Sequence, residues 1–123
     1  MSYSSTYVPK TLTKEDKKKQ IKSIKDKTDR PKLESFKSKR SSHVIKFEKK
    51  YKTKITDEKF INDNILKKQG QLEILKKGMG AYYSSGSRPN QTPESWAYAR
   101  LASVIMNGAA RKVDMKIWEK YKL

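Results

Sequence analysis

The first third of the chain spaces its few apolar residues as a solvated helix would. Thr13 is placed to cap a helix over residues 15–25, because its hydroxyl can accept a backbone N–H and acidic residues occupy the first turn. Only Ile21 and Ile24 give this helix an apolar edge. The pattern therefore predicts a helix that lies mostly in solvent or on a polyanion.

Pro31 interrupts this pattern, since proline lacks an N–H and restricts the residue before it. It suits the first turn of a short helix that carries Leu33 and Phe36. Further on, residues 44–51 place Val, Phe and Tyr at positions i, i+3 and i+7, which lie on one face of a helix. We expect two more helices here, again with narrow apolar faces.

The second half of the chain is more apolar and carries clearer helix boundaries. Thr56 suits the cap of a helix whose apolar stripe reaches residue 66, and a further helix is expected to end at a lysine-rich turn followed by Gly78. Thr92 and Pro93 begin the clearest helix, which runs to residue 106. Asp114 is expected to cap a last short helix. These helices should supply the core.

The elements predict a mainly α fold: a small irregular helical domain with a Gly/Ser-rich central loop and a basic N-terminal helical arm. We place the arm at residues 1–42 and a compact helical module at residues 43–123, because the first segment has too few large apolar residues for its own core. No long alternation of apolar and polar residues demands a sheet. A short ribbon that pairs residues 82–84 with 111–113 is the one candidate for strand structure.

The loop predicted at residues 78–91 is rich in glycine, serine and tyrosine and contains Arg88. Two interpretations stay open. Its backbone N–H groups, hydroxyls and Arg88 suit a phosphate, and the helix that starts at Thr92 points its N-terminus toward the loop. Alternatively the loop is structural, with its tyrosines packed on Trp96 and Arg88 fixing the turn. It is not a Walker A loop, since no Gly-Lys-Ser/Thr follows the required spacer.

Charge is the strongest functional signal. The 123 residues hold 30 Lys and Arg against 13 Asp and Glu, a formal net charge of +17, and residues 1–54 alone hold 18 basic and 6 acidic residues. Basic character this strong is typical of nucleic-acid binding. Lysine far outnumbers arginine, so we expect neutralisation of phosphates rather than readout of bases. Because the arm has few aromatic residues on which bases could stack, duplex DNA is the expected partner.

The candidate nucleic-acid contacts lie in the arm, in the segment that follows it and in the central loop. They are Lys17, Lys18, Lys19, Lys22, Lys25, Lys37, Lys39, Arg40, Lys46, Lys49, Lys50, Lys52, Lys54 and Arg88.

Other functional classes find little support. No stretch approaches the roughly 18 apolar residues that a membrane-spanning helix needs, and the N-terminus lacks the apolar region of a signal peptide. The chain has no cysteine, and its single histidine, His43, rules out a two-histidine metal site. Helix capping and neighbouring lysines account for most carboxylates. We therefore expect no enzymatic activity and no cofactor; an enzyme that acts on phosphates through the central loop is the weakest alternative.

A more specific signal begins with the stretch KGMGAYYSSGSRPNQT at residues 77–92. It is followed by Trp96, by Ala-Arg-Leu at residues 99–101 and by Ala-Arg-Lys-Val-Asp at residues 110–114. This pattern resembles a small domain of giant DNA viruses and some tailed phages. The resemblance covers about residues 43–121, leaves the arm outside and assigns no catalytic residue. It implies a viral protein in a virion or genome-packaging context.

Charge and resemblance together predict a lysine-rich, nucleoid-type virion protein that binds double-stranded DNA without sequence specificity and condenses the genome. We expect it in the virion interior, and in the host cytoplasm during assembly, with other virion proteins as further partners and no membrane association. The main alternative is a minor capsid or scaffold protein that docks through residues 82–100. Trp118 and Tyr121 either anchor a homo-oligomer or, as we favour, complete the monomer core.

Overall fold

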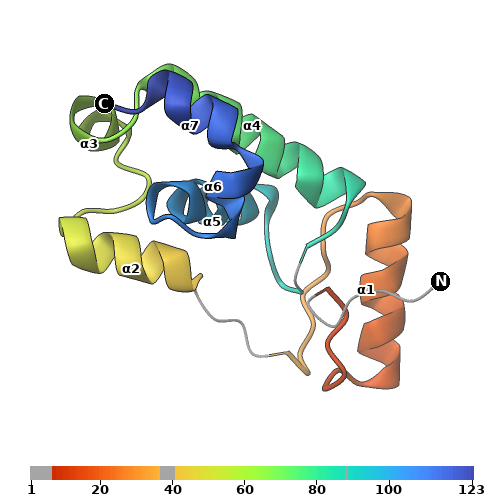
Figure 1. Cartoon of the computed structure of the whole chain (residues 1–123). Helices are drawn as coiled ribbons and strands as arrows, with labels where there is room; N and C mark the ends of the chain where they lie inside the picture. The colour runs from red at the N-terminus through yellow and green to blue at the C-terminus, as the bar shows by residue number, and fades with distance from the viewer. Residues whose placement is uncertain (1–6, 37–40, 88) are drawn as a thin grey trace.

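The computed structural model describes residues 7–36, 41–87 and 89–123 (Figure 1). Within them lie seven helices: α1 (Lys14–Asp26), α2 (Ser42–Tyr51), α3 (Glu58–Asn64), α4 (Lys68–Ser84), α5 (Pro93–Ile105), α6 (Ala109–Val113) and α7 (Met115–Tyr121). The described residues form no strand, and a single antiparallel bridge among them joins Leu66 to Lys122. The fold is mainly α, as the sequence predicts.

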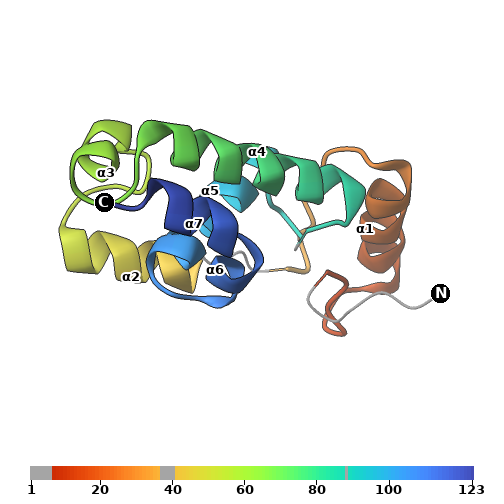
Figure 2. The ribbon, with the colours of Figure 1, turned by 45° about the horizontal axis from the view of Figure 1, so that its top comes forward.

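The main core surrounds the contact between α4 and α5, on which α2, α3, α6 and α7 pack (Figures 1 and 2). Phe47, Ile61, Ile74 and Leu101 come from four different helices, and each is fully buried there. Trp118 of α7 packs against this core from the outside. The aromatic residues of the last helix therefore contribute to the packing of the monomer.

The contact between α4 and α5 explains the glycine at position 78. α4 runs without a break from Lys68 to Ser84, so the predicted helix end at Gly78 is wrong. A Cβ at Gly78 would lie 2.7 Å from the Cα of Ala97 on α5. The glycine therefore permits a close approach of two helix backbones rather than a reversal of the chain. The helical residues 78–84 also remove the first half of the predicted loop.

Two helix starts are confirmed in atomic detail. The Thr13 hydroxyl accepts the N–H of Asp16 at 3.2 Å at the start of α1. At the start of α5, the hydroxyls of Thr92 and Ser95 each accept the backbone N–H of the other residue at 3.0 Å. These reciprocal bonds satisfy backbone donors that a helix start otherwise leaves without partners.

Other local predictions are wrong. The ribbon does not form, because residues 82–84 end α4 and residues 111–113 belong to α6. Residues 32–36, which follow Pro31, make a turn rather than a helix. Asp57 rather than Thr56 caps α3: its carboxylate accepts the Phe60 N–H at 3.2 Å. Asp114 does occupy the N-cap position of α7, as predicted, but its side chain makes no capping bond there.

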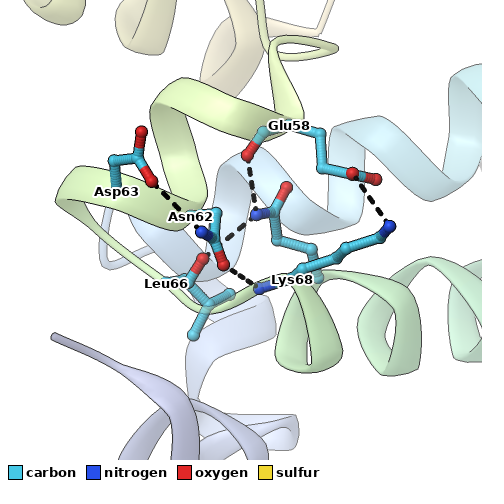
Figure 3. A network of polar contacts seen from close by, with 6 residues as sticks. Glu58, Asn62, Asp63, Leu66 and Lys68 are labelled. Atoms are coloured by element: carbon cyan, nitrogen blue, oxygen red, sulfur yellow. Dashed lines mark hydrogen bonds and ion pairs between the residues drawn. The ribbon is translucent and has the colours of Figure 1, made fainter.

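A polar network fixes the turn between α3 and α4 (Figure 3). The Asn62 side chain accepts the backbone N–H of Lys68 at 2.8 Å, and the Lys68 ammonium lies 3.5 Å from the Glu58 carboxylate. The buried Gln71 amide donates to the backbone carbonyls of Glu58 and Leu66 at 3.2 and 3.0 Å. These bonds hold α3 against the start of α4.

Candidate nucleic-acid interface

α1 carries a row of lysines on the face that points away from the body of the protein. Lys14, Lys18, Lys22 and Lys25 follow one another at intervals of four, four and three residues, which align them along one side of the helix. All four are exposed. At about 1.5 Å per residue, this α1 lysine row is about 17 Å long. Lys14 was missed among the predicted contacts, although the same helical spacing identifies it.

Polar side chains hold the opposite face of α1 against the body. Gln20 is fully buried, and its amide donates to the backbone carbonyls of Tyr7 and Ser87 at 2.9 and 3.0 Å. Asp16 accepts the hydroxyl and the backbone N–H of Ser35. These bonds, the hydroxyl bond first, hold the pKa of Asp16 below its ordinary value, and nearby Lys19 adds to the effect. The docked face keeps the lysine row turned toward solvent.

Arg30 ties the segment after α1 to the end of α4. Its guanidinium, which is buried, donates to the Tyr82 carbonyl at 2.8 Å and to the Ser23 hydroxyl at 3.1 Å, and lies 4.7 Å from the Tyr82 ring centre. No carboxylate among the described residues pairs with it, so the negative carbonyl end of α4 offsets the charge. Beside it the Tyr83 hydroxyl donates to Asp29 at 2.7 Å, which raises the pKa of Tyr83 to about 12.

A second group of lysines lies on α2 and in the connection that follows it. Lys46 and Lys49 are exposed on α2, and Lys52 and Lys54 are exposed between α2 and α3. Lys50 is also exposed, with its ammonium 5.2 Å from the ring centre of the adjacent tyrosine. We call these five residues the α2 lysine group.

The structure does not bring the two sets of lysines together. α1 and α2 lie at opposite ends of the molecule in both views (Figures 1 and 2). Among the described residues, no ion pair involves either set. Lysines of the C-terminal half do form ion pairs: Lys68 with Glu58, Lys77 with Asp114, and Lys122 with Glu119. The α1 and α2 lysines therefore keep their charges available for a polyanion.

The other predicted nucleic-acid contacts belong to neither set of lysines. Lys17 is half-buried and Lys19 is exposed, and both flank the α1 lysine row. Lys37, Lys39, Arg40 and Arg88 lie outside the residues that the structure describes.

The described part of the connection between α4 and α5 makes structural contacts. Ser87 is fully buried, and its carbonyl accepts the Gln20 amide. The Asn90 side chain accepts the N–H of Leu33 at 2.6 Å and donates to the carbonyls of Leu33 and Phe36, each at 3.1 Å. These contacts support the structural interpretation of the connection, because they hold the segment after α1 in place.

Fold and surface together define a small, mainly helical protein with two separate sets of exposed, unpaired lysines. The chain belongs to the family described as "Family of unknown function (DUF5824)", whose sequence model matches residues 5–118. The match includes α1 and the Arg30 segment, so the family covers the arm as well as the helices that follow. No curated protein and no solved structure matches the chain.

The described residues contain neither a metal-binding cluster nor a membrane-spanning helix. No group of three or more His, Cys, Asp or Glu side chains among them is placed to hold a metal ion. None of the described helices is both long enough and apolar enough to cross a membrane.

Proposed function

We propose that this chain is a virion protein that binds double-stranded DNA without sequence specificity and condenses the genome. The observation that carries the proposal is the α1 lysine row, which is exposed and unpaired while the other face of α1 is fixed. Lysine ammonium groups suit phosphates as point charges and carry no fork for base edges. Duplex DNA has one phosphate for every 1.7 Å of its axis, so about ten phosphates fall within the roughly 17 Å of the row.

Condensation needs more than binding, and the position of the α2 lysine group supports it. Because α1 and α2 lie at opposite ends (Figure 1), one molecule presents positive charge in two places. It can therefore neutralise one duplex segment and hold a second beside it. The net charge of +17 favours the same outcome through neutralisation alone. The virion interior, and the host cytoplasm during assembly, follow from the viral resemblance of residues 77–114.

The binding test compares two variants of equal charge. The row variant changes the four lysines of the α1 lysine row to glutamine. The control changes four exposed lysines outside both sets that form no ion pair among the described residues: Lys67, Lys76, Lys112 and Lys116. Each variant loses four positive charges from a protein of net charge +17.

Binding to a random-sequence duplex of about 30 base pairs is measured by fluorescence anisotropy at several salt concentrations. Each phosphate contact contributes about 0.9 to the slope of log K against log salt, so the row variant should lose about 3 to 4 from the slope magnitude. The slope magnitude of the control variant should fall by less than about 1, because its four lysines do not lie in one row on a helix. Equal losses in the two variants would show that net charge rather than the row binds DNA.

The condensation test uses two DNA fragments with different labels, which sediment together only when the protein links them. A variant with Lys46, Lys49, Lys52 and Lys54 changed to glutamine should keep the binding made by α1 and lose co-sedimentation. The row variant should lose it too. Undiminished co-sedimentation by either variant would refute linkage through two surfaces while leaving DNA binding itself intact.

One observation favours the alternative of a minor capsid or scaffold protein. Val113 is 71% exposed and Met115 is 38% exposed, and these apolar side chains lie where α6 meets α7. The predicted docking surface at residues 82–100 is a weaker candidate, because Tyr82 is fully buried. If Val113→Ser and Met115→Ser together abolish association with capsid proteins and leave the DNA salt slope unchanged, the alternative is preferred.

A further inference from the structure

A groove of about 900 Å³ lies against α5. Ser95, Ala99 and Ser103 line it at intervals of four residues, so they lie on one side of α5, opposite Ala97. Their small side chains leave the space open. The other walls come from the first turn of α2, the connection before α5, and α6, with Tyr7, residues 55–56 and Ala81 of α4 completing them. Sites for small molecules typically enclose about 300–1,000 Å³, so the groove has the size of a ligand site.

The polar groups of four side chains that line the groove are not used by the fold, whereas others, among them Thr92, Ser95 and Ser103, form hydrogen bonds within it. The side chains of Ser42, His43, Trp96 and Tyr98 all line the groove, and none forms a hydrogen bond to a described residue. By contrast, the buried amides of Gln20 and Gln71 donate to backbone carbonyls. The Trp96 ring meets the Tyr7 ring edge to face, with 6.2 Å between the ring centres, and Tyr98 packs against the core. Donors without hydrogen-bond partners beside aromatic rings are suited to a ligand that carries both a ring and acceptor atoms.

The charge around the groove favours an anion. No Asp or Glu lines it, whereas Arg100 does. Arg100 donates through Nε and one terminal nitrogen to the buried Asp114, at 2.7 and 2.8 Å. Its other terminal nitrogen has no partner among the described residues. Asp114 also raises the pKa of Arg100, so the guanidinium stays protonated.

We propose that this groove binds a nucleoside phosphate, either free or as the terminal nucleotide of a DNA strand. Trp96 and Tyr98 offer aromatic surface to the base. His43, Arg100 and the Ser42 hydroxyl supply donors for the phosphate oxygens. The groove residues belong to neither set of lysines, so the site is independent of duplex binding by α1.

One of the two tryptophans of the chain reports on the groove. Trp96 lines it, whereas Trp118 lies 4.2 Å from the Arg111 guanidinium and does not line it. Trp118→Phe in the full chain leaves Trp96 as the only tryptophan. ATP, adenosine and inorganic tripolyphosphate are then titrated separately while tryptophan fluorescence is recorded. We expect saturable quenching by ATP, with each of the two fragments binding at least about tenfold more weakly.

A matched pair of variants separates the groove from the general positive charge. Ser42→Glu puts a carboxylate at the groove, in the first turn of α2, where the helix dipole favours it. Gln69→Glu makes the same charge change in the first turn of α4 and lies outside the groove. Ser42→Glu should weaken ATP binding by at least about tenfold through repulsion, and Gln69→Glu by less than about twofold.

The row variant should bind ATP as the unmodified protein does, even if it no longer binds duplex DNA. Failure of the groove proposal is therefore distinguishable from failure of the DNA-binding proposal. A short single strand with a 5′ phosphate, added to the ATP complex of the row variant, identifies the source. Displacement of ATP supports a strand end, and lack of displacement supports a free nucleotide. No saturable quenching at millimolar ATP would overturn the proposal. Tripolyphosphate binding as tightly as ATP, or equal losses in Ser42→Glu and Gln69→Glu, would overturn it as well.

Discussion

Two glycines in α4 should respond in opposite directions to the same substitution. Gly80 is exposed, and a Cβ added there meets nothing within 4 Å. A Cβ added at Gly78 would lie 2.7 Å from the Cα of Ala97 and 3.1 Å from its Cβ. Backbone atoms of a packed helix cannot turn aside as the end of a flexible side chain can.

The magnitudes follow from these distances. Alanine inside a helix is more stable than glycine by about 0.5–1 kcal/mol, and both variants receive this gain. At Gly78 the new methyl must move α4 from α5 by about 1 Å, because carbon atoms pack at about 3.5–4.0 Å. Overpacking of this kind costs about 1–3 kcal/mol. The shared gain cancels in the comparison, so Gly78→Ala should be less stable than Gly80→Ala by about 1–3 kcal/mol.

Urea unfolding followed by circular dichroism measures this difference. We expect Gly80→Ala to unfold at higher urea than the unmodified protein and Gly78→Ala at lower urea, with similar slopes. If the two variants are equally stable, a side chain at position 78 does not disturb the contact between α4 and α5, and the packing argument is refuted.

Further predictions concern the docked arm. Arg30→Met removes two charged hydrogen bonds and leaves the Tyr82 carbonyl buried without a partner; we expect a loss of about 2–3 kcal/mol in urea unfolding. The exposed control Lys32→Met should change stability by less than about 0.5 kcal/mol. An Arg30→Met variant as stable as the unmodified protein would mean that desolvation of the guanidinium outweighs its bonds. Folding lowers the pKa of Asp16. The stability that its hydrogen bonds supply is therefore fully present above the unfolded pKa of about 3.9, and it is lost as the pH falls through the lower pKa of the folded state. The stability gap between Asp16→Asn and the unmodified protein should therefore be widest near neutral pH and shrink in acid; a gap constant with pH would contradict the assignment.

Local chemistry made several elements predictable from the sequence. Thr13 and Thr92 begin helices because short polar side chains satisfy backbone N–H groups there, and this needs only neighbouring residues. The period of the lysines in α1 likewise predicts which of them share a face. The mainly α class follows from such local signals taken together.

The sequence was misleading where distant residues decide the structure. Gly78 after two lysines has the local form of a helix end, but the close contact with Ala97 keeps the helix intact across it. Asp114 has the form of a helix cap, but its buried carboxylate binds Arg100 instead. Arg30 was not singled out at all, because its role depends on the end of α4, fifty-two residues away in sequence.

The candidate binding surfaces were likewise predictable only where they depend on local sequence. Composition predicted a basic protein, and helical spacing predicted exposed lysines on α1. Neither could show that α1 and α2 lie at opposite ends, or that small residues on α5 open a groove beside the first turn of α2. Both arrangements depend on how helices pack, which local patterns do not encode.

The most direct test of the central claim is the salt dependence of duplex binding by the unmodified protein. Anisotropy titrations on two unrelated sequences of about 30 base pairs should give the same slope of log K against log salt, with a magnitude above about 5, since each neutralised phosphate contributes about 0.9. This result would place the affinity in lysine–phosphate contacts without base readout. Weak binding even at low salt, or a strong preference for one sequence, would contradict the account.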